Sequence, residues 1–206
     1  DMLPAIYFIF SRRGCDNALR DLAQHSFVTA DEKHLIRKHL RNLAIANSDV
    51  VRDDLHVEAL LRGIASHHAG LLPAWKELIE WLFQQGLVKV VFATETLAAG
   101  INMPARSTVI SALSKRTDRG HRALMGSEFL QMAGRAGRRG LDSKGYVVTV
   151  QSRFEGVKEA GQLATSSADP LVSQFTPSYG MVLNLLQRYD LDKSKELIER
   201  SFSRYL

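Results

Sequence analysis

Runs of apolar residues, separated by polar and glycine-containing stretches, set the pattern of this 206-residue sequence. The most nearly continuous run spans 87–93, where Lys89 is the one polar residue. Residues 5–10 form a second run of β-branched and aromatic side chains, and shorter runs occupy 109–112 and 146–150. Short runs of this kind are typical of strands that are buried on both faces of a sheet. We therefore predict four such strands.

Apolar residues with helical spacing lie between these runs. Pro73 suits a first helical turn, the apolar positions after it recur three and four residues apart, and Gly86 is typical of a helix end. Helices are also predicted over 15–23 and 127–133. The charged segment at about 30–62 carries two further apolar stripes with helical spacing, which predicts a helical insertion there.

Strands that alternate with helices predict an α/β domain whose central sheet is mostly parallel and covered on both faces. This domain is expected to occupy residues 1–152. Beyond it the pattern changes to a surface helix, a polar linker and two short helices. Residues 153–206 are therefore expected to be a linker and the beginning of a following domain, which Leu206 cuts off.

Ligands of parallel sheets bind at the carboxyl ends of the strands. This rule directs attention to the loops after Phe10 and Ala93 and to the glycine-rich stretch near Arg135. The positive charges support the same choice, because they are concentrated in three segments that also contain glycine, 11–14, 115–120 and 135–140. Such loops can approach a phosphate group closely.

The composition excludes several classes of protein. No stretch approaches the roughly 18 uncharged apolar residues that a membrane span needs, so no membrane partner is expected, and the N-terminus shows no targeting signal. Cys15 is the only cysteine, which excludes an internal disulfide and an all-cysteine zinc site. The net charge of +5 and the isoelectric point near 9.5 are compatible with a polyanionic partner.

The segment from Gln131 to Gly140 has the most distinctive chemistry. Gln131, Arg135 and Arg138 would lie along one side of a helix-to-loop transition, and the glycines between them let the backbone approach a ligand. Arginine offers a planar, permanently charged fork for phosphate oxygens. The pattern alone leaves three interpretations open: phosphate chemistry, a basic surface turn, or a nonspecific nucleic-acid patch.

The Q-x-x-G-R-x-G-R pattern of 131–138 resembles motif VI of superfamily 2 helicases. Residues 93–105, with T-E-T followed by G-I-N-M-P-A, are similar to motif V, and 10–13 resemble motif IV. The H-H-A-G-L-L-P segment at 67–73 and the tail at 171–186 match the superkiller-type DExH RNA helicases. The resemblance covers nearly the whole chain, with the motifs in the family's order. It implies the second RecA-like domain of such a helicase.

This resemblance implies a three-layer RecA-like domain of the P-loop NTPase type, followed by a winged-helix-like domain. It also implies ATP with Mg²⁺ as cofactors, held mainly by the N-terminal RecA-like domain of the same protein. In the family's pattern Arg135 and Arg138 are arginine fingers that reach the γ-phosphate of that ATP. Gln131 and Gly100 line the nucleotide cleft, and Asn102 contacts the nucleotide or its metal.

On the other edge of the domain, the resemblance implies contacts with the backbone of single-stranded or partly duplex RNA. The residues that match are Ser11, Arg12, His68, Gly70 and Thr94. Backbone contacts fix position without reading sequence, so binding should be sensitive to salt and largely independent of sequence. Related helicases place a strand-separating β-hairpin where this chain has 111–126, and a plain solvated loop is the alternative there.

Two short segments look like a helicase motif and a metal site but are expected to be neither. The D-E-x-H letters at 31–34 lie in a charged helical segment, where acids suit the first helical turn. His67 and His68 are adjacent and should point apart, and neither a carboxylate nor a cysteine stands at ligand spacing in the sequence, so no metal site is expected. No G-x-x-x-x-G-K-[ST] segment occurs, so this chain alone is expected to be inactive as an ATPase.

The sequence is therefore expected to be the C-terminal motor domain of a larger ATP-dependent RNA helicase. The residues at 151–156 and 174–180 resemble most the cyanobacterial and plastid members of the family. This resemblance implies bacterial cytoplasm or chloroplast stroma and a role in RNA processing or decay. Two other classes remain open: a non-catalytic RNA-binding or docking module, and a domain of a related DNA helicase.

Overall fold

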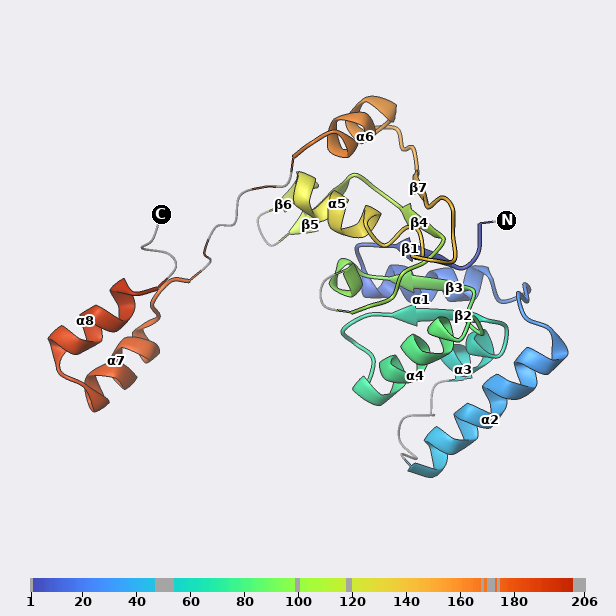
Figure 1. The fold of residues 1–206 in the computed structure, drawn as a ribbon, viewed down its shortest axis with the longest axis horizontal. Helices are drawn as coiled ribbons and strands as arrows, with labels where there is room; N and C mark the ends of the chain where they lie inside the picture. The colour runs from blue at the N-terminus through green and yellow to red at the C-terminus, as the bar shows by residue number, and fades with distance from the viewer. Residues whose placement is uncertain are drawn as a thin grey trace. The chain divides into compact units, whose positions relative to one another are not determined.

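The computed structural model describes residues 2–46, 54–98, 101–117, 120–167, 169, 173 and 175–201. Its centre is a sheet of five parallel strands in the order β2-β3-β1-β4-β7 (Figure 1). The strands are β1 (Ala5–Phe8), β2 (Ile64–His67), β3 (Val90–Ala93), β4 (Ser107–Ile110) and β7 (Tyr146–Thr149). The prediction of an α/β fold with a parallel sheet is confirmed.

Alternate residues of the central strands point to opposite faces of this sheet. In β3, Val91 and Ala93 belong to one apolar cluster and Phe92 to another, and in β1 Ile6 and Tyr7 divide in the same way. The larger cluster is completed by residues of α2 (Ala30–Ala46), α4 (Pro73–Gln84) and α5 (Gly126–Ala133). The smaller cluster is completed by α1 (Arg12–Asp21) and α3 (Asp54–Leu60). The domain therefore has the three layers of a RecA-like fold.

Helix α4 illustrates how the local sequence sets an element. Pro73 stands in its first turn, its buried side chains recur at helical spacing from Trp75 to Phe83, and the chain turns after it at Gly86. Gly86 has φ +71°, a left-handed conformation that glycine adopts without steric cost. The helix predicted from Pro73 is thus confirmed, together with its end.

Strand β2 was not predicted. All four of its residues are buried, but two of them are Ser66 and His67, so the sequence shows neither an apolar run nor an alternation. The predicted helices of 30–62 are found as α2 and α3, with 47–53 outside the described residues. They are not a peripheral insertion, because Ile36, Leu40 and Leu60 are part of the main core.

A two-stranded antiparallel sheet follows β4. It consists of β5 (Ser114–Thr117) and β6 (Gly120–Ala123), with Ser114 opposite Ala123 and Thr117 opposite Gly120. Of the two interpretations of 111–126, the hairpin is therefore the one that the structure shows. Residues 118 and 119, which join the strands, lie outside the described residues.

The chain divides into two compact units, Asp1–Ala168 and Asp169–Leu206. The first unit includes α6 (Val157–Ala164), which packs against α5, so it extends beyond the expected boundary at 152. The second unit holds α7 (Tyr179–Arg188) and α8 (Leu191–Glu199), which pack on each other. Its assignment to a winged-helix-like domain stays a prediction. Among the described residues, no helix is long and apolar enough to cross a membrane.

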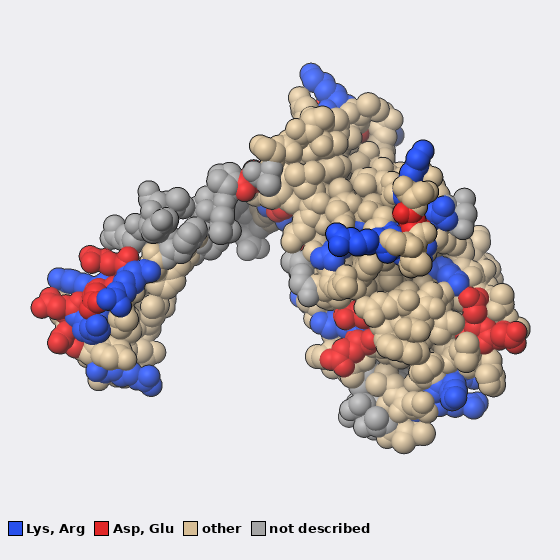
Figure 2. All heavy atoms as spheres, in the orientation of Figure 1, with Lys and Arg blue, Asp and Glu red and all other residues tan. Residues whose placement is uncertain are grey.

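Lysine and arginine side chains are interspersed with aspartate and glutamate on the face of the molecule that Figure 2 shows. Although the net charge is +5, the basic side chains do not form one uniform surface in this view. A specific site for a polyanion has to be found from the placement of individual side chains.

Candidate functional site

The carboxyl ends of β1 and β3 open into a small groove. Its lining includes Ser11 and Arg12 from the start of α1, Ala69 from the loop after β2, and Thr94 from the end of β3. Three of the predicted RNA-binding residues thus come together, and Ala69 stands between the other two, His68 and Gly70. Lys115 and Arg116 of the hairpin also line the groove, and they belong to the basic segment 115–120 that the sequence had indicated as able to approach a phosphate.

Backbone and side-chain contacts fix Ser11 and Thr94, the hydroxyl-bearing residues of this groove that the sequence predicts to bind RNA. The Ser11 hydroxyl accepts a hydrogen bond from the Gly14 amide at 2.8 Å and so caps helix α1. The Thr94 amide donates to the His67 carbonyl at 3.2 Å, and the Thr94 hydroxyl lies 2.9 Å from that of Thr96. Both residues are therefore held in place before any ligand binds.

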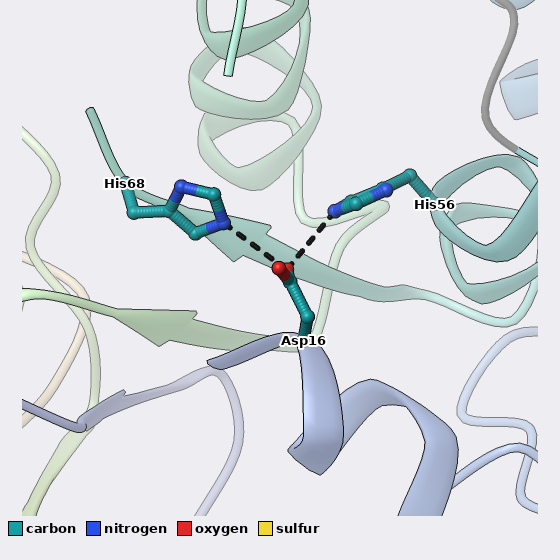
Figure 3. Close-up of side chains that lie close together, drawn as sticks. All are labelled: Asp16, His56 and His68. Carbon is teal, nitrogen blue, oxygen red and sulfur yellow. Dashed lines mark hydrogen bonds and ion pairs between the residues drawn. The ribbon is translucent and has the colours of Figure 1, made fainter. Parts of the chain in front are cut away.

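His68 points into the protein (Figure 3). Its Nε2 lies 3.1 Å from Asp16 Oδ1, and its Nδ1 accepts a hydrogen bond from the Gly70 amide at 3.1 Å. Because both ring nitrogens have protein partners, a contact between the ring and RNA requires one of these bonds to open. His67 turns the other way, with Nε2 2.8 Å from Glu80 Oε1 on α4.

Asp16 also contacts His56, because Nε2 of His56 lies 3.2 Å from Asp16 Oδ1, the oxygen that His68 contacts. The sequence offered no carboxylate near His68, but the fold brings one from α1, so the ligand atoms of Asp16, His56 and His68 lie within 4.8 Å of one another. Burial alone would raise the pKa of Asp16, but the hydrogen bonds from His68 and His56 outweigh it and lower that pKa.

The second site is the loop that follows α5. Arg135 donates through Nη2 to the Ala98 carbonyl at 2.5 Å and through Nη1 to the Ile101 carbonyl. Its own carbonyl accepts from the Ala105 amide at 2.8 Å. The guanidinium of Arg135 therefore joins the 131–140 segment to the 94–105 segment. Gln131, on α5, is exposed.

Arg138 forms a two-pronged ion pair with Asp142. Its Nε lies 2.8 Å and its Nη2 2.9 Å from the two carboxylate oxygens, and the Arg138 amide also donates to Oδ2 at 3.0 Å. The hydrogen bond from the Arg138 side chain lowers the pKa of Asp142 to about 2. Asp142 is a residue that the sequence did not single out, and because 138–142 form a turn and not a helix, the spacing rule for helical ion pairs does not point to it.

Arg138 and Asn102 line one cleft, of about 540 Å³, together with Gln84 and Arg139. Gln84 donates to the Asn102 carbonyl at 3.1 Å, which ties the cleft to α4. Gln131 and Arg135 are not part of its lining, and Gly100 lies outside the described residues. The structure thus brings together two of the residues predicted for the nucleotide.

Glycines hold the 131–140 loop against the sheet. Gly137 has φ +89°, and its amide donates to the Ala105 carbonyl at 2.7 Å. Gly145 crosses beneath the loop so closely that a Cβ there would lie 2.6 Å from the carbonyl carbon of Ala136. At these two positions the lack of a side chain therefore serves the fold itself, in addition to any ligand.

An ion-pair network connects the hairpin with the groove and with helix α5. Lys115 on β5 contacts Glu95, which directly follows Thr94, and its Nζ lies 2.7 Å from Glu128 Oε1 on α5. Arg122 on β6 donates to both oxygens of Glu128, at 2.6 and 2.9 Å. Hydrogen bonds from Arg122 and Lys115 lower the pKa of Glu128 to about 2.

Comparison with known proteins shows which family this chain is similar to. Residues 32–140 match the family described as "Helicase conserved C-terminal domain". The chain is 50% identical to the chloroplastic DExH-box ATP-dependent RNA helicase DExH15 of Arabidopsis thaliana, covering 100% of this chain and 19% of that protein. It is 42% identical to the probable helicase HelY of Mycobacterium tuberculosis, covering 99% of this chain and 23% of that protein. It is 39% identical to the exosome RNA helicase MTR4 of Mus musculus, covering 98% of this chain and 20% of that protein.

The five-stranded parallel sheet and the helices on both of its faces define a RecA-like domain. The chain belongs to the helicase conserved C-terminal domain family, in its superkiller, MTR4 and HelY type of DExH-box RNA helicases. It spans about a fifth of the length of the curated relatives that it matches.

Proposed function

We propose that this chain is the C-terminal motor domain of an ATP-dependent RNA helicase, which couples an RNA groove to a nucleotide site shared with an N-terminal RecA-like domain. One observation carries the proposal: residues 94–105 take part in both clusters. Thr94 lines the groove, and the carbonyls of Ala98 and Ile101, a few residues further on, are held by Arg135. Arg135 thus contacts the same segment that supplies Thr94 to the groove, and on this ground we propose that the two clusters are coupled.

At the nucleotide site we assign the phosphate contacts to Arg138 and to Arg135, whose guanidinium would first have to leave the Ala98 and Ile101 carbonyls. We assign Gln131 and Asn102 to the same nucleotide, together with Gly100, which lies outside the described residues. ATP with Mg²⁺, bound mainly by the partner domain, supplies the γ-phosphate. Arg138 now pairs with Asp142, and we expect phosphate oxygens to compete with that carboxylate when the domains close. Engaging the phosphate therefore requires Arg138 to exchange one carboxylate partner for the phosphate oxygens.

At the groove, Arg12 and Arg116 supply positive charge, and Ser11, Thr94 and Gly70 supply small polar contacts to an RNA backbone. Lys115 is less available for RNA, because it already pairs with Glu95 and Glu128. The same ion pairs anchor the hairpin beside the groove, a position from which it can separate strands of a partly duplex RNA. Contacts of this kind fix position without reading sequence.

The natural setting that we propose is RNA processing or decay, in bacterial cytoplasm or chloroplast stroma. The support is that one relative is named as chloroplastic and others as an exosome RNA helicase and a superkiller complex protein. The natural partners are accordingly the N-terminal RecA-like domain and a complex that processes or degrades RNA.

The test uses the full-length protein and measures RNA-stimulated ATPase activity for Arg138→Ala. An arginine finger contributes on the order of 10³ to 10⁵ in turnover, so kcat should fall by at least about a hundredfold. Arg153→Ala, at an exposed arginine outside both clusters, is the matched control. Wild-type kcat for Arg138→Ala would refute the finger assignment.

Nucleic-acid preference is tested in the same protein by competition between RNA and DNA of identical sequence. We expect RNA to bind more tightly. Equal binding would favour a DNA helicase domain, and RNA binding without any arginine-dependent turnover would favour a non-catalytic module.

A further inference from the structure

Asp16 joins three elements that are distant in the sequence. It lies on α1, His56 lies on α3, and His68 follows β2. Both imidazole Nε2 atoms approach the same carboxylate oxygen, at 3.2 and 3.1 Å, from different sides (Figure 3). Ser66 adds its hydroxyl at 3.3 Å. The histidine side chains are only 9% and 5% exposed and the Asp16 side chain is 25% exposed, so this partly buried carboxylate is the centre of a polar cluster.

The hydrogen bond from the Gly70 amide determines how His68 is protonated. An amide N–H can only donate, so Nδ1 of His68 must hold a lone pair and the ring proton must lie on Nε2. That proton is directed at Asp16. A metal ion bound by the same nitrogen would need a lone pair there, so the observed bonds describe a hydrogen-bonded chain of Gly70, His68 and Asp16.

This series of hydrogen bonds ends at Gly70, beside the RNA groove. Gly70 lies beside both residues: a Cβ added to it would lie 3.1 Å from His68 Nδ1, which is tight, and 3.4 Å from Arg12 Cδ, which is an ordinary contact. Arg12 and Asp16 are four residues apart on α1, one helical turn. The carboxylate therefore holds the loop over the arginine that stands one turn before it on the same helix.

We infer that Asp16 is a positioning residue of the RNA groove, which holds the His68–Gly70 loop against Arg12 through the His68 ring. This inference rests on the proposed RNA-binding function. In this arrangement the His68 ring holds the loop in place and does not itself contact the RNA. The groups that contact the RNA are the loop backbone and Arg12. His56 and Ser66 hold the carboxylate from the side of α3 and β2.

The experiment measures binding of a fluorescein-labelled oligouridine to the full-length protein by anisotropy, together with RNA-stimulated ATPase activity. Asp16→Asn keeps the shape but removes the charge, and we expect the RNA Kd to rise about tenfold, as for loss of one charge-assisted hydrogen bond. The RNA concentration for half-maximal ATPase should rise in parallel, with kcat at saturating RNA within about twofold of wild type. Asp16→Glu keeps the charge and should recover most of the affinity.

Asp21→Asn is the matched control, because Asp21 is exposed at the end of the same helix. Wild-type RNA affinity in Asp16→Asn, with only a lower unfolding temperature, would overturn the inference and leave Asp16 a structural residue. Stoichiometric zinc in the purified wild type that Asp16→Asn lacks would overturn it in favour of a metal site.

Two further variants keep the test decisive. Should Asp16→Asn not fold, His56→Gln disturbs the carboxylate from the side of α3, and it should weaken RNA binding by a smaller factor; unchanged binding would again overturn the inference. Thr94→Ala separates the two proposals. Weaker binding in Thr94→Ala but not in Asp16→Asn rejects only the positioning role, whereas unchanged binding in both rejects the groove.

Discussion

Glu128→Gln tests the network that connects the hairpin with α5. In the wild type the Glu128 carboxylate accepts hydrogen bonds from Arg122 and from the Met125 amide at 2.9 Å, and it pairs with Lys115. Its pKa is lowered from about 4.5 to about 2. At 1.36 kcal/mol per pKa unit this corresponds to about 3 kcal/mol. Solvent reaches the side chain, which is 21% exposed, so we expect screening to leave about 1–2 kcal/mol.

The assay is urea unfolding of the chain, followed by the fluorescence of Trp75 and Trp81 on α4. At pH 7 Glu128→Gln should lower the free energy of unfolding by about 1–2 kcal/mol. The Glu77→Gln variant, at an exposed position of α4, should change it little.

The pH dependence follows from the direction of the pKa change. Because the folded-state pKa of Glu128 is depressed, its contribution is fully present above about pH 4.5 and is lost as the pH falls toward about 2. The difference between wild type and Glu128→Gln should therefore shrink across that window. A difference that stays constant from pH 7 to the acid limit, or that matches Glu77→Gln at pH 7, would refute the reasoning.

Three further outcomes are expected. Gly145→Ala should destabilise the domain by about 1–3 kcal/mol in the same unfolding assay, because its Cβ would meet the Ala136 backbone, whereas Gly161→Ala, which has open space in α6, should be neutral or stabilising; equal effects would contradict the close crossing. Arg116→Ala in the full-length protein should weaken oligouridine binding several-fold and reduce the salt slope by about one phosphate contact, and an unchanged slope would remove Arg116 from the groove. The Cys15 thiol, whose pKa burial raises to about 12, should resist a thiol reagent at pH 8 until urea unfolds the chain; rapid labelling of the native protein would show that the thiol is accessible.

The local pattern determined most of the elements. Pro73 and Gly86 mark the limits of α4, and the apolar runs at 5–10 and 87–93 contain β1 and β3, because periodicity and turn residues act over a few neighbouring positions. The order of the motifs was likewise sufficient to identify the family, and to single out Ser11, Arg12 and Thr94, which the fold places in one groove.

Pairings between distant residues depended on the tertiary structure. Strand β2 was hidden by Ser66 and His67, whose polar side chains are buried only because the fold provides partners for them. Asp16 and His68 are separated by 52 positions, and Lys115 and Glu95 by 20, so no local spacing announces either pair. A charged side chain shows its sign in the sequence, but the partner that it meets is chosen by the packing of the sheet and its helices. The sequence thus supplied most of the candidate site residues, and the fold decided which of them, such as Ser11 and Thr94, lie in one groove and which, such as His68, are held by distant neighbours.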